Sequence, residues 1–462
     1  MRLNYFNFRL FDNDSYLLTN DFGNFCFLTQ TDFISLVHGG NPSNINELKE
    51  KGFVIDENQE VFVRSFIPRL QSVKNHLFTS TELFIFVVTK RCNLDCIYCQ
   101  AKSDGNEGPM MTREMAKKAV DTALSSPTTN MTFEFQGGEP LINFDVIKFI
   151  VEYTEQNRGN RHITYSLVSN LLLLNDEIIA FIQRYNISLC TSLDGSKTVH
   201  DNNRPLIGGV GSYELLKKAI RKVNASEIPL NAIETTTRKA LSHAHELVDE
   251  YIDMGFSSLF IRPLTPLGQA EKQWNEIGYT PEEFCHFYRE IIYYIVELNK
   301  SGKKIVENHA RILLSKIIGG GSENYMELRS PCGAAIGQMA FYHDGFVYTC
   351  DEGRMLAEMG DPSFRLGRIG DSYENLICGN SCRAVATASV LESLPGCSDC
   401  VYMPYCGVCP VVNYRVGNNI FAKEPKAFRC KIYSGMLDIL FELLHSDDYN
   451  ISNILNDWVG DR

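Results

Sequence analysis

The stretch LFIFVVTKRCNLDCIYCQ (Leu83 to Gln100) joins an apolar run to three cysteines, Cys92, Cys96 and Cys99, in the spacing Cys-x3-Cys-x2-Cys. A short run of β-branched and aromatic residues predicts a buried strand, so the cysteines follow its carboxyl end. Three thiolates on one tight loop can ligate three irons of a 4Fe-4S cluster and leave the fourth iron open. The alternative is a zinc site with a distant fourth ligand, since zinc prefers four closed ligands.

Five further apolar runs follow, and segments with helical periodicity separate them. The expected strands are 83–89, 131–137, 163–169, 187–193, 230–236 and 258–264. Expected helices between them include 112–125 and 144–157. Six β/α repeats predict an α/β fold with a parallel sheet, open or closed as a partial barrel, whose site lies at the carboxyl ends of the strands.

The overall composition and charge exclude several classes of function. The 462 residues suggest roughly two to four domains, and 44% hydrophobic with 22% charged residues is typical of soluble globular proteins. A net charge of −12 argues against a nucleic-acid partner, because that affinity needs clustered Lys and Arg. The first residues do not resemble a signal peptide and no long apolar run follows, so we expect a cytoplasmic protein without a membrane partner. Fifteen cysteines in a reducing compartment predict metal sites or catalysis rather than disulfides.

Motifs at the ends of two later strands resemble those of a known family. FQGGEP (Phe135 to Pro140) ends the second strand, and SLDGSKTVHDNNRP (Ser192 to Pro205) ends the fourth. With the cysteine loop, they resemble the radical S-adenosylmethionine (SAM) superfamily, and the second motif is similar to that of members that modify peptides and proteins. The resemblance implies that the open iron binds SAM. It also implies that SAM cleavage gives a 5′-deoxyadenosyl radical, which abstracts hydrogen from unreactive carbon.

The same resemblance assigns residues to SAM, namely Tyr98, Gly137, Gly138, Glu139, Ser192 and Arg204. Glu139 would accept a hydrogen bond from the SAM amino group, beside the glycine-rich turn. Arg204 would pair with the SAM carboxylate, because a guanidinium presents a rigid donor fork. Asp194 and His200 are as well suited to brace the loop. After the third strand, relatives often carry Thr-Asn-Gly, whereas this chain has Leu171 in place of the glycine.

Cysteines beyond the repeats resemble the seven-cysteine SPASM domain, in which a Gly-x4-Cys motif (here Gly345 to Cys350) precedes a Cys-x2-Cys-x5-Cys motif. The resemblance implies two auxiliary clusters. One would use Cys397, Cys400, Cys406 and Cys430, and the other Cys332, Cys350 and Cys409. Only two residues separate Cys406 from Cys409, where relatives have three, and the second set lacks a fourth cysteine. A zinc ribbon is the alternative. The remaining cysteines are expected to be buried small apolar residues: Cys26, Cys190, Cys285, Cys378 and Cys382.

Asp351 follows Cys350 directly. In sulfatase-maturing relatives an aspartate at this position is a candidate acid or base beside the substrate. A partly dehydrated carboxylate has a tunable pKa and could take the proton released when a substrate radical is oxidised. The alternative is a solvated acid next to a metal ligand.

Residues 1–75 combine a hairpin pattern at 16–28 with helical patterns at 33–37 and 45–51. This order resembles the winged-helix peptide-recognition module of peptide-modifying enzymes. The alternative is an extension that only packs on the core. We therefore expect a winged-helix-like domain (1–75), a radical SAM partial (β/α)6 barrel (83–320), a SPASM domain (331–435), and a C-terminal helix and tail (436–462).

Taken together, the motifs resemble radical SAM/SPASM peptide maturases, above all those of the His-Xaa-Ser system. The resemblance implies an oxidoreductase that modifies, and plausibly crosslinks, a ribosomally synthesised precursor peptide bound through its leader. Its cofactors would be SAM and three iron-sulfur clusters, and its reductant a flavodoxin or ferredoxin. One alternative is an anaerobic sulfatase maturase that forms formylglycine. Another is a non-catalytic electron-transfer or peptide-binding protein that uses the same clusters.

Overall fold

The computed structural model describes residues 2–55, 58–99, 107–320, 325–421 and 427–460. Its largest sheet has the strand order β12-β11-β10-β9-β8-β7-β6-β13-β14-β15. Neighbours from β6 to β11 are parallel and follow the order of the sequence. Their bounds are β6 Leu83–Val87, β7 Asn130–Gln136, β8 His162–Val168, β9 Ser188–Ser192, β10 Leu230–Thr235 and β11 Ser258–Arg262. The predicted parallel α/β sheet is confirmed.

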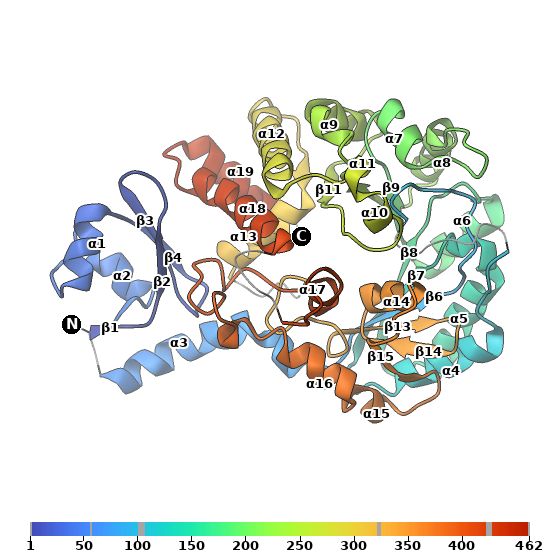
Figure 1. Cartoon of the computed structure of the whole chain (residues 1–462), viewed down its shortest axis with the longest axis horizontal. Helices are drawn as coiled ribbons and strands as arrows, with labels where there is room; N and C mark the ends of the chain where they lie inside the picture. The colour runs from blue at the N-terminus through green and yellow to red at the C-terminus, as the bar shows by residue number, and fades with distance from the viewer. Residues whose placement is uncertain (1, 56–57, 100–106, 321–324, 422–426, 461–462) are drawn as a thin grey trace.

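Helices alternate with these strands and cover one side of the sheet (Figure 1). They are α4 Arg113–Leu124, α5 Phe144–Asn157, α6 Asp176–Tyr185, α7 Lys197–Asn203, α8 Tyr213–Ala225 and α9 Ala244–Asp253. After β11 come α10 Gln269–Lys272, α11 Trp274–Ile277, α12 Pro281–Lys300 and α13 Asn308–Ile317. Thr112 caps α4 by accepting from the backbone N–H of Met115 at 3.2 Å. Thr280 and Glu283 form a capping box at the start of α12. The two helices expected between strands, 112–125 and 144–157, are confirmed as α4 and α5.

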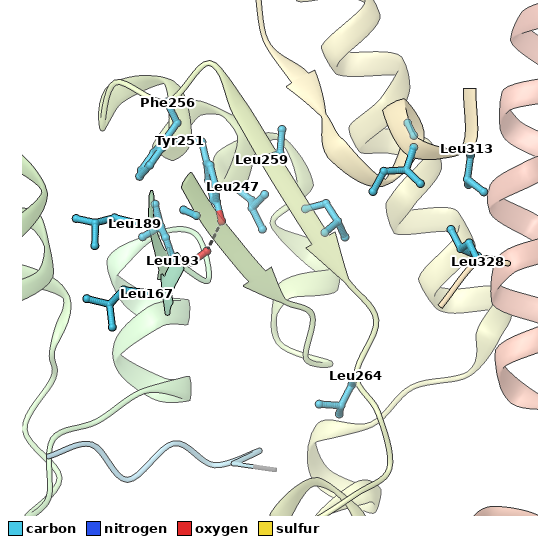
Figure 2. Packing of buried hydrophobic residues seen from close by; sticks show 14 of the residues in the cluster. Leu167, Leu189, Leu193, Leu247, Tyr251, Phe256, Leu259, Leu264, Leu313 and Leu328 are labelled. Atoms are coloured by element: carbon cyan, nitrogen blue, oxygen red, sulfur yellow. Dashed lines mark hydrogen bonds between the residues drawn. The ribbon is translucent and has the colours of Figure 1, made fainter. Parts of the chain in front are cut away.

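The core between sheet and helices is apolar and closely packed. Leu189, Leu247 and Leu259 are almost fully buried there (Figure 2). The hydroxyl of Tyr251 donates to the carbonyl oxygen of Leu193 at 2.8 Å, which satisfies a polar group at the end of β9. This packing holds the strands rigidly, so that their carboxyl ends can position a site.

The sheet continues into the cysteine-rich region. β13 (Gln338–Tyr342) pairs in parallel with β6, and β14 (Phe346–Tyr348) and β15 (Arg365–Arg368) add antiparallel strands. At the other edge, β12 (Val306–Glu307) pairs with β11. Further helices are α14 Asp351–Glu358, α15 Tyr373–Ile377, α16 Asn380–Thr387, α17 Pro410–Gly417, α18 Phe428–Leu444 and α19 Tyr449–Gly460. The expected C-terminal helix at the start of 436–462 thus begins earlier, at Phe428, and a second helix, α19, follows it.

The N-terminal part has its own antiparallel sheet, far from β6 to β11 in Figure 1. The predicted hairpin is confirmed as β3 (Ser15–Thr19) and β4 (Phe25–Thr29), and β2 (Asn7–Leu10) adds an edge strand that the pattern did not predict. The two predicted helices are confirmed as α1 Gln30–Val37 and α2 Ile45–Glu50. β1 (Arg2–Leu3) pairs with β5 (Val54–Ile55), and α3 is Gln59–Val73.

This N-terminal sheet rests on the loop that carries the later cysteines. The hydroxyl of Thr19 donates to the carbonyl of Val401 at 2.7 Å, and the amide of Asn7 donates to the carbonyl of Cys400 at 3.0 Å. The Tyr405 hydroxyl donates to the carbonyl of Gly23 at 3.1 Å. No helix in the described ranges is both long and apolar enough to cross a lipid bilayer.

Candidate active site

Four of the predicted motifs follow β6, β7, β8 and β9, which are adjacent parallel strands. The carboxyl ends of parallel strands meet at one edge of the sheet, where ligands of such folds bind. The cysteine loop, the 137–140 turn, the 169–171 turn and the 192–205 segment are therefore brought together there.

The cysteine loop is tied on both sides by backbone hydrogen bonds. The N–H of Glu139 donates to the carbonyl of Arg91 at 2.7 Å. On the other side, the N–H of Asp95 donates to Pro205 at 2.8 Å and that of Ile97 to Asn203 at 3.0 Å. The loop that carries Cys92, Cys96 and Cys99 is thus held between the second and fourth strand-end motifs.

Gly137 and Gly138 allow the close approach of this loop. A Cβ atom at Gly137 would lie 2.6 Å from the carbonyl oxygen of Thr89, and one at Gly138 would overlap the carbonyl oxygen of Arg91. Any side chain there would push the cysteine loop away from the turn. The two glycines therefore allow the 137–140 turn to pack directly against the cysteine loop.

Glu139 is buried behind the loop. Its Oε1 accepts from the N–H of Leu141 at 3.0 Å and from the hydroxyl of Ser169 at 2.8 Å, and its Oε2 accepts from the N–H of Asn170 at 2.8 Å. A carboxylate has about four acceptor positions, so capacity for one more donor remains. Burial raises the pKa of Glu139 to about 7, against the opposing effect of these hydrogen bonds.

Leu171 takes the left-handed backbone conformation, with φ of 66°, where relatives often have glycine. Its N–H donates to the hydroxyl of Ser169 at 2.9 Å. The neighbouring Asn170 amide donates to the side-chain oxygen of Asn93 at 2.7 Å, next to Cys92. The backbone therefore makes the same turn that a glycine would make, although the left-handed conformation costs a leucine about 1–2 kcal/mol. Burial of the leucine side chain offsets that cost.

Arg204 lies in a buried network with Asp194 and Tyr98. The carboxylate Oδ2 of Asp194 accepts from the Tyr98 hydroxyl at 2.5 Å, the Asn203 amide at 3.2 Å and Nε of Arg204 at 3.1 Å. The Arg204 guanidinium also lies 5.1 Å from the centre of the Tyr98 ring. Because the hydrogen bond to Asp194 uses Nε, the two Nη groups of the donor fork can face a ligand.

Asp194 and His200 brace this loop. The ring Nδ1 of His200 accepts from the N–H of Asp194 at 3.3 Å, and its Nε2 lies 3.2 Å from the hydroxyl of Ser212. Burial lowers the pKa of His200 to about 4, so the ring is neutral at pH 7. Ser192, at the end of β9, shares a small hollow with Asn170 and Arg204.

The thiols of the cysteine loop lie in a mostly apolar setting. Burial raises the pKa of Cys92 to about 12, and the charges of Glu139 and Cys99 add to that rise. Burial likewise raises the pKa of Cys96, which Arg204 opposes. All three cysteines are free. Such thiols ionise when they bind a metal, and soft thiolates suit iron-sulfur clusters, so the donor set fits a cluster.

Among the residues that the structure describes, no three His, Cys, Asp or Glu side chains meet at one point as the ligands of a single metal ion do. A 4Fe-4S cluster makes a different demand, because each thiolate binds a different iron. The spread of the cysteine side chains over each loop is compatible with that demand.

Later cysteines fall into two groups. Cys332, Cys350 and Cys409 belong to one buried apolar cluster, each less than a tenth exposed. Cys397, Cys400 and Cys406 lie in another, while Cys430 is in the first turn of α18. Of the cysteines without an assigned role, Cys26 and Cys382 are buried, and Cys190 and Cys285 are partly buried. Cys378 is exposed, so the expectation of burial is wrong there, because its position at the end of α15 faces solvent.

Asp351 is the first residue of α14, for which Cys350 is the N-cap. Its Oδ1 accepts from Nε of Arg354 at 3.0 Å and from Nη2 at 2.5 Å. Arg354 is only 2% exposed. The Asp351 side chain is 15% exposed, and a buried guanidinium holds its carboxylate.

Glu134 on β7 was not predicted as a site residue. Its carboxylate accepts from the Gln136 amide at 2.5 Å. Burial raises the pKa of Glu134, the hydrogen bond from Gln136 opposes that rise, and the charge of Asp351 adds to it. The alternation in MTFEFQG was the available signal, because Phe133 and Phe135 point to the core and Glu134 to the opposite face.

Comparison with known proteins agrees with this site. Residues 86–238 match the family model of the Radical SAM superfamily, and this part of the chain is a radical SAM domain. A protein of unknown function from Methanocaldococcus jannaschii is 34% identical over 39% of the chain, and the match spans 62% of that relative's length. A cysteine-type anaerobic sulfatase-maturating enzyme of Clostridium novyi is 24% identical over 76% of this chain and 94% of its own. The radical SAM cyclopropyl synthase TigE of Paramaledivibacter caminithermalis is 23% identical over 93% and 87%.

Solved structures share the fold. The structure of anSMEcpe with bound AdoMet and Kp18Cys peptide covers 82% of this chain and 99% of its own, at a TM-score of 0.68 and 21% identity. Streptococcus suis SuiB bound to the precursor peptide SuiA covers 92% and 97%, at a TM-score of 0.56 and 15% identity. The chain therefore has an α/β radical SAM fold.

Proposed function

We propose that this protein is a radical SAM enzyme that oxidatively modifies, and crosslinks, a ribosomally synthesised precursor peptide. The observation that carries the proposal is the joining of the cysteine loop to the motifs after β7, β8 and β9 by the hydrogen bonds described above. Two solved structures of the same fold contain peptides, Kp18Cys and SuiA, which supports a peptide substrate here.

Cys92, Cys96 and Cys99 would hold the first cluster, and Glu139 and Arg204 would bind the amino and carboxylate groups of SAM. When bound, the cluster and SAM supply a 5′-deoxyadenosyl radical that removes hydrogen from a carbon of the substrate. The roles of the chain are to orient SAM and to keep water from the site. Asp194 fixes Arg204 for this task, since it accepts from Nε.

Asp351 is our candidate for the proton acceptor. Both hydrogen bonds from Arg354 fall on Oδ1, and Oδ2 is the atom that we assign to the proton. The charge of Asp351 in turn contributes to the raised pKa of Glu134, after the larger effect of burial. A positioned carboxylate of this kind contributes typically 10²–10⁴-fold to a proton transfer.

The later cysteines would hold two auxiliary clusters that carry electrons away from the oxidised substrate. The set on Cys397, Cys400, Cys406 and Cys430 lies beside the N-terminal sheet, because Asn7 donates to the carbonyl of Cys400. A flavodoxin or ferredoxin would be the reductant that supplies the electron to the first cluster.

The N-terminal sheet is our candidate for leader recognition. β2 is an edge strand, and its Phe8 and Leu10 are 51% and 55% exposed. An extended peptide can add a strand at such an edge, with affinity from backbone hydrogen bonds and specificity from side-chain pockets. These same strands also pack on the 398–405 loop, so recognition and packing are combined in one element.

A sulfatase maturase is the second candidate, favoured by the similarity over 94% of the Clostridium novyi enzyme. The test incubates the reduced, reconstituted protein with SAM and either a sulfatase-derived peptide or a precursor peptide encoded beside its gene. We expect 5′-deoxyadenosine together with a mass loss on the precursor peptide only. Modification of the sulfatase peptide alone would favour the second candidate. SAM left intact by reduced, cluster-loaded protein would make the chain a non-catalytic carrier.

A further inference from the structure

The helix α14, which lies beside β13 (Figure 1), carries a charged side chain at each end. Asp351, its first residue, is held by Arg354. Glu358, its last residue, pairs with Lys90, whose Nζ lies 2.7 Å from Oε2 of Glu358. The hydroxyl of Tyr342, on β13, donates to Oε1 of Glu358. The Lys90 and Glu358 side chains are only 16% and 7% exposed, so salt screens their attraction much less than that of a surface pair.

Lys90 belongs to the segment that leads into the cysteine loop, two residues before Cys92. Its N–H donates to the carbonyl of Pro109 at 3.1 Å. A Cβ atom at Gly138 would lie 2.8 Å from the carbonyl oxygen of Lys90, so the turn after β7 packs directly on this backbone. The Lys90 backbone is therefore fixed at the proposed SAM site, while its side chain reaches the far end of α14.

A second route connects the same end of α14 to the cysteine loop. The N–H of Gly268 donates to the sulfur of Met359, the residue that ends α14, at 3.2 Å. The next N–H in the chain, that of Gln269, donates to the carbonyl of Cys99 at 3.1 Å. The carboxyl end of α14 is thus attached both to the segment after β6 and to the segment after β11.

We propose that Lys90 is a positioning residue, which through Glu358 fixes α14, and with it Asp351, relative to the loop that holds the first cluster. This role rests on the proposed function, in which hydrogen abstraction and proton removal act on the same substrate residue. The eight residues of α14 form one rigid element, on the order of 10 Å long at about 1.5 Å per residue. An ion pair at one end therefore sets the position of the carboxylate at the other. Lys90 itself exchanges no proton with the substrate in this role.

The test measures the moles of modified precursor peptide formed per mole of 5′-deoxyadenosine, with the full-length, cluster-loaded enzyme. We expect Lys90→Met and Glu358→Gln to lower this ratio at least about tenfold, because displacing a group by about 1 Å can cost on the order of 10²-fold. Lys90→Arg, which retains the cation, should restore most of the ratio. Lys118→Met is the matched control, because Lys118 pairs with Glu114 on the surface of α4, and it should leave the ratio unchanged.

A pair with a merely structural role would give a different pattern. Partial loss of folded enzyme would lower SAM cleavage and peptide modification together, so the ratio of the two products would stay constant. A constant ratio in Lys90→Met and Glu358→Gln, or an equal fall in Lys90→Arg, would overturn the inference. Combining Lys90→Met with Glu358→Gln should lower the ratio no further than either change alone, since both remove one contact. Additive losses would also count against the pair.

Hydrogen exchange separates this inference from the proposed function. The backbone amides of α14 should exchange faster in Lys90→Met and Glu358→Gln than in the unsubstituted protein, whether or not a peptide is modified. Unchanged protection of α14 in both variants would overturn the role of Lys90. If exchange is faster, but the unsubstituted enzyme cleaves SAM and modifies no precursor peptide, the proposed substrate is contradicted and Lys90 still sets the position of α14.

Discussion

Arg204 and Asp194 form a buried ion pair, in which Nε of Arg204 lies 3.1 Å from Oδ2 of Asp194 and the Asp194 side chain is completely inaccessible to solvent. Asp194 also accepts from the backbone N–H of Thr235, on the neighbouring strand, at 3.3 Å. The pair therefore couples the orientation of the proposed SAM-binding guanidinium to the position of β10.

Replacing Asp194 by Asn should destabilise the protein and weaken SAM binding. Loss of one partner of a buried pair leaves an uncompensated charge, which costs about 3–5 kcal/mol of the free energy of unfolding. Denaturant titration and calorimetric SAM binding would measure the two effects. Asp176→Asn is the control, since its carboxylate is 97% exposed and pairs only at the surface with Lys222, and it should change neither.

SAM affinity should rise with pH through about 7. Burial raises the pKa of Glu139 to about 7, so the carboxyl is neutral below that pH and becomes an anionic acceptor for the SAM ammonium above it. Isothermal titration calorimetry of SAM binding between about pH 5.5 and about pH 8.5, a range that spans this pKa, would follow the change in affinity. Glu139→Gln should bind SAM weakly at every pH, and a variant that keeps the wild-type pH profile would contradict the assignment.

Replacing Cys92, Cys96 and Cys99 together by Ala should abolish SAM cleavage while the auxiliary clusters remain. The intact protein should hold about twelve irons and the variant about eight, because each cysteine set supports one 4Fe-4S cluster. Iron analysis and Mössbauer spectra after anaerobic reconstitution would count them. Stoichiometric zinc with little iron would contradict the assignment of these cysteines to iron-sulfur clusters.

Asp351→Asn should uncouple SAM cleavage from product formation, because the amide cannot take the substrate proton. We expect 5′-deoxyadenosine to form while modified peptide falls by about 10²-fold or more. The two products can be quantified in the same mass-spectrometric assay. Asp351→Glu, which retains a carboxylate, is expected to recover part of the product yield. A full yield of product from Asp351→Asn would show that Asp351 is not the proton acceptor and only forms the ion pair with Arg354.

Phe8→Asp should weaken binding of the precursor and leave SAM cleavage without peptide unchanged. Phe8 is 51% exposed on edge strand β2, so the change places a charge where a leader would pack. Val63→Asp is the matched control, because Val63 is 46% exposed on α3. Fluorescence anisotropy with a labelled leader would compare the two. Equal affinities would remove β2 from the recognition surface.

Strand positions were predictable because each strand of the repeat buries alternate apolar residues, as Phe133 and Phe135 do on β7. The pairing of β13 with β6 was not, since it joins residues more than 200 positions apart and no local pattern encodes it. Likewise, the order of motifs indicated which loops would meet, and the structure adds how they meet.

The partners of the charged site residues could be identified only from the structure. Arg204 was recognised from its motif, but the burial of Asp194 beside it depends on the turn after β9. The pair of Lys90 and Glu358 combines residues from two separate segments, each unremarkable in the local sequence. Leu171 illustrates the limit of motif reading, because the glycine turn persists without glycine.

Unequal shielding of the cysteines has a consequence for handling the protein in air. Cys332, Cys350 and Cys409 are 5%, 3% and 7% exposed, whereas Cys96 and Cys99 are more open to solvent. Oxidation of sulfur ligands follows their accessibility. Cys400, Cys406 and Cys430 are as open as Cys96 and Cys99. Aerobic purification should therefore damage the SAM-cleaving centre and the cluster on Cys397, Cys400, Cys406 and Cys430 before the cluster on Cys332, Cys350 and Cys409, and leave an inactive protein whose residual colour comes from that last cluster.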